Sequence, residues 1–291
     1  MMKRVAIHDP ACRPGHLAQR GFTLLEAVLV IVLTGVVAAM VGVFIRAPID
    51  SYVDQARRAE LTDTADTALR RMARELPAAL PNSVRVAAGG KALEFIPVVD
   101  AGRYRAAPAA DGSGDFLDVD SASDGSFEVI GPGVDVASGD QLVVYNLGLP
   151  GADAYSGESR RALTSTGSAL SSLTYAVGGT QFPYASPSHR FQVVGTPVSY
   201  LCTDGAAGSG HLRRYSGYAI QAAQPTSAAA APLAALSGRH NALLAGQVES
   251  CSFDYEGTGS ARNALLTLTL KLSAAGESVT LLHQMHVDNS P

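Results

Sequence analysis

The sequence predicts an α+β protein in which one long N-terminal helix packs on an antiparallel β-sheet. Apolar residues recur at helical spacing as far as residue 76, and from about residue 84 onward they alternate with a period of two. The chain has 291 residues, which is enough for such a helix and one sizeable domain, or two small ones.

The first part of the predicted helix is long and apolar enough to span a membrane. It covers residues 22–45, at about 1.5 Å per residue, and Glu26 is its only charged residue. A carboxylate in hydrocarbon costs at least about 2.5 kcal/mol, so we expect Glu26 to have a partner and a function. The basic residues before the segment predict a cytoplasmic N-terminus and a translocated body. These residues are Lys3, Arg4, Arg13 and Arg20.

Two simpler explanations of this segment fit less well. An ordinary secretory signal would have a shorter apolar region, and Ala38-Ala39 is a poor cleavage site. A plain uncleaved anchor accounts for the length of the segment. Neither alternative explains the position of Glu26.

The second part of the predicted helix is amphipathic. Its apolar stripe consists of Ile49, Val53, Ala56, Leu61, Ala65, Leu69, Met72 and Leu76. This spacing predicts a half-exposed helix that packs on a sheet. Pro48 removes one backbone hydrogen bond and predicts a helix kink, whereas Pro77 and Pro81 predict the end of the helix.

The β-region is clearest near the C-terminus. Two alternating segments, 266–272 and 279–287, flank a predicted hairpin turn at 274–276. Further strands are expected at 92–98, 141–146, 191–194, 198–202, 215–221 and 251–255. Loops are expected at 111–125, 148–179 and 222–238, which are rich in Asp, Gly, Ser or Ala.

Three cysteines bear on the cellular compartment. Cys202 shares a strand face with Val198 and Tyr200, and Cys251 shares another with Phe253. If the body lies outside the inner membrane, we expect a buried disulfide between these two cysteines, with two buried thiols as the alternative. Cys12 would stay on the cytoplasmic side.

The sequence contains no recognisable catalytic motif, so we expect a protein that is not an enzyme and has no cofactor and no metal. Its acidic loop at 111–125 lacks the spacing of an EF-hand, although clustered carboxylates leave calcium as an alternative. Arg213-Arg214-Tyr215 with Tyr218 is a basic and aromatic cluster of the kind that binds single-stranded DNA. His283 and His286 fall on opposite faces of a predicted strand, so they are poorly placed to share a metal.

The N-terminal segment Gly21-Phe22-Thr23-Leu24-Leu25-Glu26, with its basic leader and apolar run, resembles the signal of type IV prepilins and secretion pseudopilins. The resemblance implies that a prepilin peptidase cleaves between Gly21 and Phe22 and methylates the new N-terminus of Phe22. It also implies that Glu26 pairs with the Phe22 amine of a neighbouring subunit, because an unpaired charge in an apolar bundle is costly.

This family resemblance implies a division of the chain. Residues 1–21 would be a leader that is removed, residues 22–45 the transmembrane and assembly half of the helix, residues 46–76 its amphipathic half, and residues 77–291 a periplasmic globular domain. The leader contains four of the 22 basic residues and one of the 26 acidic ones, so the mature chain has a net charge of −7. Because nucleic-acid affinity is largely electrostatic, no nucleic-acid partner is expected.

Within this family, several stretches are similar to the O-type minor pilins of the mannose-sensitive haemagglutinin (MSHA) pilus. They are 52–55, 57–61, 68–74, 80–85, 143–148, 151–155 and 190–191. That similarity implies a single-pass inner-membrane protein whose partners are the prepilin peptidase, other minor and major pilins and the inner-membrane assembly platform. A J-like minor pseudopilin of a type II secretion system is the first alternative, and a DNA-uptake pilin is the second.

Overall fold

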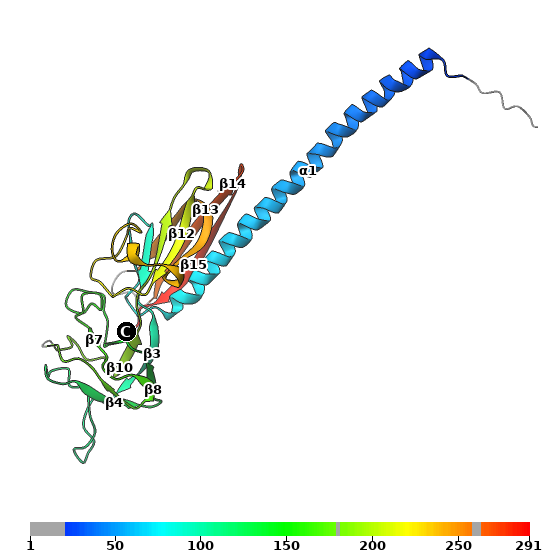
Figure 1. Ribbon diagram of the computed structural model, residues 1–291. Coiled ribbons are helices and arrows are strands. Elements are labelled where there is room, and N and C mark those ends of the chain that lie inside the picture. Colours follow the sequence, from blue (N-terminus) through cyan, green and yellow to red (C-terminus); the bar gives the residue numbers. More distant parts are fainter. Residues whose placement is uncertain (1–20, 179–180, 258–262) are drawn as a thin grey trace, which may run out of the picture. The chain divides into compact units, whose positions relative to one another are not determined.

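The computed structural model describes residues 21–178, 181–257 and 263–291. It divides into two compact units, Met1–Val53 and Asp54–Pro291, which are described separately. The expected α+β class is confirmed, because one long helix is followed by antiparallel strands (Figure 1).

Helix α1 spans Leu24–Glu75 and is followed by a single 3₁₀ turn, η1 (Leu76–Ala78), which contains Pro77. The predicted end at residue 76 is therefore confirmed within one residue. The helix assignment continues through position 48, so the kink at Pro48 stays a prediction.

The larger sheet has seven strands in the order β1-β2-β11-β12-β13-β14-β15. The strands are β1 (Arg85–Ala87), β2 (Ala92–Phe95), β11 (Val198–Thr203), β12 (Gly210–Ser216), β13 (Asn241–Glu256), β14 (Asn263–Ala274) and β15 (Glu277–Asp288). Ala275 and Gly276 have φ of 49° and 89° in the turn between β14 and β15, which confirms the predicted hairpin.

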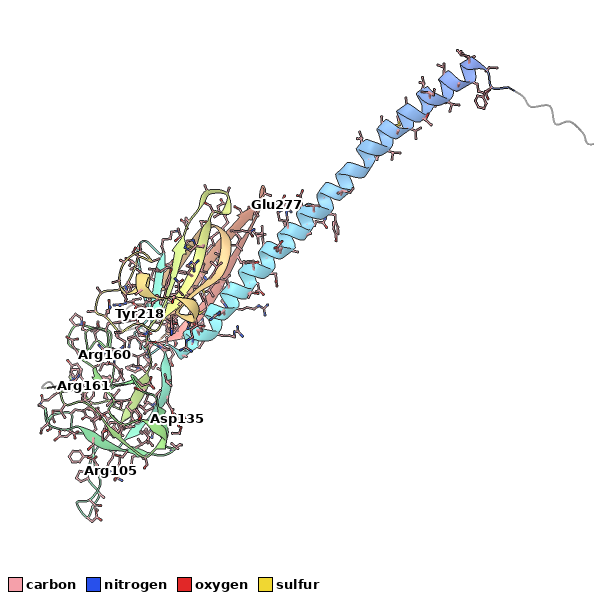
Figure 2. The ribbon with its side chains drawn as sticks, viewed as in Figure 1. Arg105, Asp135, Arg160, Arg161, Tyr218 and Glu277 are labelled. Atoms are coloured by element: carbon pink, nitrogen blue, oxygen red, sulfur yellow. A yellow bond between two sulfur atoms is a disulfide. The ribbon has the colours of Figure 1, made fainter. Side chains whose placement is uncertain are left out.

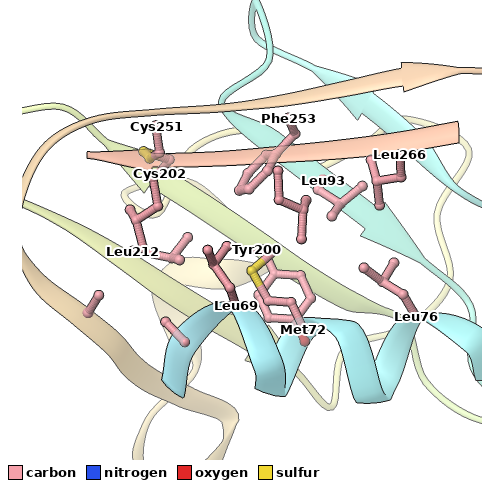
Figure 3. Packing of buried hydrophobic residues seen from close by; sticks show 14 of the residues in the cluster. Leu69, Met72, Leu76, Leu93, Tyr200, Cys202, Leu212, Cys251, Phe253 and Leu266 are labelled. Atoms are coloured by element: carbon pink, nitrogen blue, oxygen red, sulfur yellow. A yellow bond between two sulfur atoms is a disulfide. The ribbon is translucent and has the colours of Figure 1, made fainter. Parts of the chain in front are cut away.

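The apolar stripe of α1 packs on this sheet within the second unit. Leu61, Ala65, Leu69 and Met72 are at most 4% exposed, and they share one core with residues of β2, β11 and β14 (Figure 3). The buried stripe begins at Leu61, because the predicted members Ile49, Val53 and Ala56 are exposed.

A second β-region, which the sequence did not indicate as a separate layer, is inserted between β2 and β11. Its six-stranded sheet has the order β7-β6-β10-β3-β4-β9, and β5 pairs with β8 beside it. The strands are β3 (Val98–Tyr104), β4 (Ser126–Ile130), β5 (Val134–Val136), β6 (Gln141–Val143), β7 (Arg160–Ala162), β8 (Gly167–Leu170), β9 (Ser172–Thr174) and β10 (Arg190–Val194). Phe127 and Phe191, both fully buried, anchor a core of its own.

Three sequence expectations are wrong in detail. The strand expected at 92–98 is two strands, because the chain leaves β2 after Phe95 and enters β3 at Val98, with Pro97 unable to donate a ladder hydrogen bond. The strand expected at 215–221 instead ends at Ser216, since Gly217 has a φ of 80°. The loop expected at 148–179 contains β7, β8 and β9.

Other expectations agree more closely. The strand expected at 141–146 is shorter than predicted, whereas the loop at 111–125 has no regular element. The loop expected at 222–238 contains one short 3₁₀ turn, η3 (Leu233–Ala235), and reaches the first residue of another, η4 (Gly238–His240). A further 3₁₀ turn, η2 (Ala206–Gly208), connects β11 to β12.

Candidate assembly site

The first turn of α1 is capped by the side chain of Thr23, the residue before the helix. Thr23 Oγ1 accepts a hydrogen bond from the backbone N–H of Glu26 at 3.2 Å, and the Thr23 carbonyl accepts one from Ala27 N–H at 3.1 Å. The spacing Thr-x-x-Glu is that of a capping box, a signal that was present in the sequence. A carboxylate in the first helical turn also interacts favourably with the helix dipole.

The two residues at the predicted cleavage position are not required by the packing of the chain. Phe22 is 73% exposed, and a Cβ atom added to Gly21 would meet no atom within 4 Å. Packing within the described residues therefore does not explain why a glycine stands at position 21 and a phenylalanine at position 22.

The apolar half of α1 is exposed along its length. The segment Leu24–Phe44 has 21 residues, and its large side chains, such as Leu24 at 83% and Phe44 at 79%, are open to the surroundings. At 1.5 Å per residue this segment is about 32 Å long, close to the thickness of the bilayer core. Within the described residues the Glu26 carboxylate has no hydrogen-bond or ion-pair partner.

The last turn of α1 is joined to the larger sheet through Glu75. Its carboxylate accepts hydrogen bonds from Tyr200 Oη at 2.7 Å, Arg214 Nε at 2.7 Å and Arg71 Nε at 3.3 Å. Burial opposes ionisation of Glu75, but these hydrogen bonds outweigh it and hold the pKa of Glu75 below its ordinary value. Arg71 and Glu75 have the i,i+4 spacing of a helical ion pair, whereas Tyr200 and Arg214 are brought to Glu75 by the sheet.

The disulfide expected between Cys202 and Cys251 is present, with Cα atoms 6.3 Å apart. It joins β11 to β13, which are not hydrogen-bonded neighbours because β12 lies between them in the sheet. Asp204 accepts the Cys251 backbone N–H at 3.1 Å and pairs with Lys91 at 2.6 Å. The cysteine sulfurs are engaged with each other, so this cluster offers no thiolate to a metal.

A second acid, Glu94 on β2, is fully buried. It pairs with Arg85 at 2.6 Å and accepts a hydrogen bond from Tyr218 Oη (Figure 2) at 2.8 Å. The Arg85 guanidinium also lies 3.5 Å above the centre of the Tyr155 ring. Burial dominates here and raises the pKa of Glu94, despite the nearby arginine.

The alternative interpretation of Arg213-Arg214-Tyr215 and Tyr218 as a DNA-binding cluster does not fit the structure. Tyr215 is 1% exposed and Tyr218 is 5% exposed, so neither ring is available for stacking on a base. Arg214 is engaged with Glu75. The aromatic residues of this stretch are therefore part of the core.

Three carboxylates of the acidic loop, those of Asp111, Asp118 and Asp124, accept hydrogen bonds from nearby backbone N–H groups. Asp111 accepts from Ser113 N–H at 3.0 Å, and Asp124 accepts from Asp118 N–H at 2.8 Å. These are the turn contacts that Asp residues usually make. On β15, His283 is half-buried and His286 is exposed, as the alternation predicts.

The N-terminal segment matches the family model of the prokaryotic N-terminal methylation motif over residues 17–42. The chain thus carries the N-terminus of a type IV pilin-like or pseudopilin-like protein, with the prepilin peptidase processing and pilin assembly that this motif implies. The match ends before the β-rich body. No curated protein and no solved structure matches the chain.

Proposed function

We propose that this chain is a minor type IV pilin of an MSHA-type pilus, which primes assembly of a surface filament or sits at its tip and serves attachment. The observation that carries the proposal is the methylation motif placed on an exposed, membrane-length helix that is joined to a β-rich body. The choice of the MSHA pilus rests on the resemblance of the stretches named in the sequence analysis, in the helix and in the body, to O-type minor pilins. The proposed role is structural and non-enzymatic.

In this proposal the peptidase cleaves between Gly21 and Phe22, and Phe22 becomes the methylated N-terminus. The chain waits in the inner membrane with its C-terminal domain in the periplasm, as the four basic residues before the helix favour. The assembly platform then moves it into the filament, next to other minor and major pilins.

Glu26 is proposed to pair with the charged Phe22 amine of the adjacent subunit. In support, the Glu26 side chain is exposed and has no partner among the described residues of its own chain. A charge left unpaired in an apolar helix bundle costs several kcal/mol, so such a pair would select one register between neighbouring helices.

A clean deletion strain tests the choice of machine. We expect loss of sheared surface pili while exoproteins reach the medium normally. Intact pili with exoproteins trapped in the periplasm would instead assign the chain to a type II secretion pseudopilus. Normal pili and normal secretion would contradict both assignments.

A further inference from the structure

The inserted β-region contains a cavity of about 640 Å³, within the size range of small-ligand sites. It lies over β3 and β10 and is closed on one side by the turn between β4 and β5. Figure 1 shows β3, β4 and β10 together in the lower part of the picture, and their pairing makes them neighbours in one sheet.

Three residues that line the cavity form a row across these strands. Arg190 on β10 is directly opposite Arg103 on β3, and Arg103 is directly opposite Ile130 on β4. Like charges directly opposite each other destabilise a sheet. In the part of the chain that the structure describes, neither guanidinium has a hydrogen-bond or ion-pair partner, so both are available to a ligand.

Asp100, the one acid among the residues that line the cavity, does not neutralise the two arginines. Its Oδ1 atom accepts from Ala101 N–H at 2.8 Å, and its Oδ2 atom accepts from the backbone N–H of Asp135 (Figure 2), also at 2.8 Å. The cavity therefore has a net positive charge, because its lining includes two arginines and one aspartate. The carboxylate of that aspartate is hydrogen-bonded to backbone N–H groups.

A polar side chain lies beside the arginine row. Gln192 lines the cavity and is only 9% exposed, yet its Oε1 atom is buried without a hydrogen-bond partner among the described residues. Buried polar atoms are nearly always paired. The Oε1 atom is itself inaccessible, so the Gln192 amide would meet a ligand hydroxyl only after turning toward the cavity.

The floor and one wall of the cavity are fixed by close packing. On the inner face of the sheet the Phe191 ring lies across Gly102, where an added Cβ would approach the ring to 2.8 Å. In the turn between β4 and β5, an added Cβ on Gly133 would clash with the backbone of Ala169. The backbone on these two sides of the cavity is therefore held in place, which lowers the cost of binding.

We propose that this cavity binds an anionic sugar, a pyranose ring that carries a carboxylate or a sulfate. Two adjacent guanidinium groups match a carboxylate or a sulfate, because each of these anions offers at least two oxygen atoms that can accept paired N–H···O hydrogen bonds. Ile130, 45% exposed, and Pro132 offer an apolar surface to the sugar ring. The site goes beyond the proposed filament role and does not depend on it.

The test uses the full mature chain in detergent micelles and saturation-transfer NMR. The probes are trigalacturonate, with galactotriose as its neutral counterpart, and N-acetylglucosamine 6-sulfate, with N-acetylglucosamine as its neutral counterpart. We expect saturation transfer to one or both acidic sugars and to neither neutral one. The two acidic probes distinguish a carboxylate from a sulfate as the recognised group.

The double variant Arg103→Gln/Arg190→Gln should weaken binding at least tenfold and leave the melting temperature equal or higher, because it removes a like-charge contact. Arg213→Gln, in the other sheet, should bind as the wild type does. If neither acidic sugar binds, if the neutral sugars bind equally well, or if the double variant keeps full affinity, the proposal is wrong.

Discussion

The two β-regions of this chain differ in what supports them and in how each is used. The seven-stranded sheet packs on α1 and is crossed by a disulfide, and its three C-terminal strands are long, regular and joined in sequence. The six-stranded sheet consists mainly of strands of three to five residues around two buried phenylalanines, and it holds the cavity. The first region is tied to the C-terminal part of α1, whereas the second has a core of its own.

The largest expected effect is the loss of filament incorporation in a Glu26 variant, which separates assembly from ligand binding in the cavity. Glu26→Ala should leave cleavage intact but reduce incorporation into sheared filaments at least tenfold, because an unpaired amine would remain in the apolar bundle. Immunoblots of membrane and sheared fractions measure both steps. The cavity variant Arg103→Gln/Arg190→Gln is the control and should be incorporated normally. Normal incorporation of Glu26→Ala would rule out the charge pairing.

A second comparison concerns the two cores. Met72→Ala removes a fully buried side chain from the helix-sheet core, and Phe127→Ala removes one from the inserted core. We expect losses of about 2–5 and 3–5 kcal/mol, respectively, in the free energy of unfolding.

A third cluster of buried residues, which includes Leu80, Val143 and Val194, connects both regions, so unfolding by denaturant should show one shared transition. Two separate transitions would mean that the regions fold independently.

The disulfide affects only the first region directly. Cys202→Ser opens a loop with a sequence separation of 49 residues. In the chain-entropy model this costs about 4 kcal/mol under oxidising conditions. Thermal unfolding with and without reductant measures the difference, which should nearly vanish in reductant. An equal loss in both conditions would show that the substitution acts through packing.

The smallest predicted effect depends on pH. The folded pKa of Glu75 lies below its ordinary value of 4.5, so its contribution is present above that value and is lost as the pH falls through the folded pKa. Glu75→Gln should therefore cost about 1–3 kcal/mol at pH 7 and less in acid.

Glu94→Gln is the matched comparison, because the folded pKa of Glu94 is raised. Its proton-linked contribution is present below the ordinary pKa and is lost as the pH rises through the folded pKa. Relative to wild type, this variant should become more favourable as the pH rises. If the difference in unfolding free energy from wild type changed with pH in the same way for both variants, the environments assigned to Glu75 and Glu94 would be wrong.

The sequence predicted the first region much better than the second. The strands β14 and β15 alternate over 12 residues each, and Ala275-Gly276 marks their turn, so local pattern was sufficient. In β2 all four residues are buried, including Glu94, and this conceals the period of two. Strands as short as β7 and β9, set among Gly and Ser residues, are defined by pairing with distant partners rather than by their own sequence.

The candidate sites follow the same division. Gly21, Phe22 and Glu26 belong to a contiguous motif, so they could be predicted from the sequence. The two cysteines could be predicted as well, because each lies in a strand whose apolar and polar residues alternate. The cavity depends on the register between β3, β4 and β10, which places Arg103 beside Arg190 although 87 positions separate them in the sequence. No local pattern contains that pairing.

The most direct test of the central claim is mass spectrometry of the N-terminal peptide from the membrane-bound protein. We predict a mature chain that begins at Phe22 with a methylated amine. An intact leader, or cleavage at another position such as Ala38-Ala39, would contradict the assignment of this chain as a prepilin.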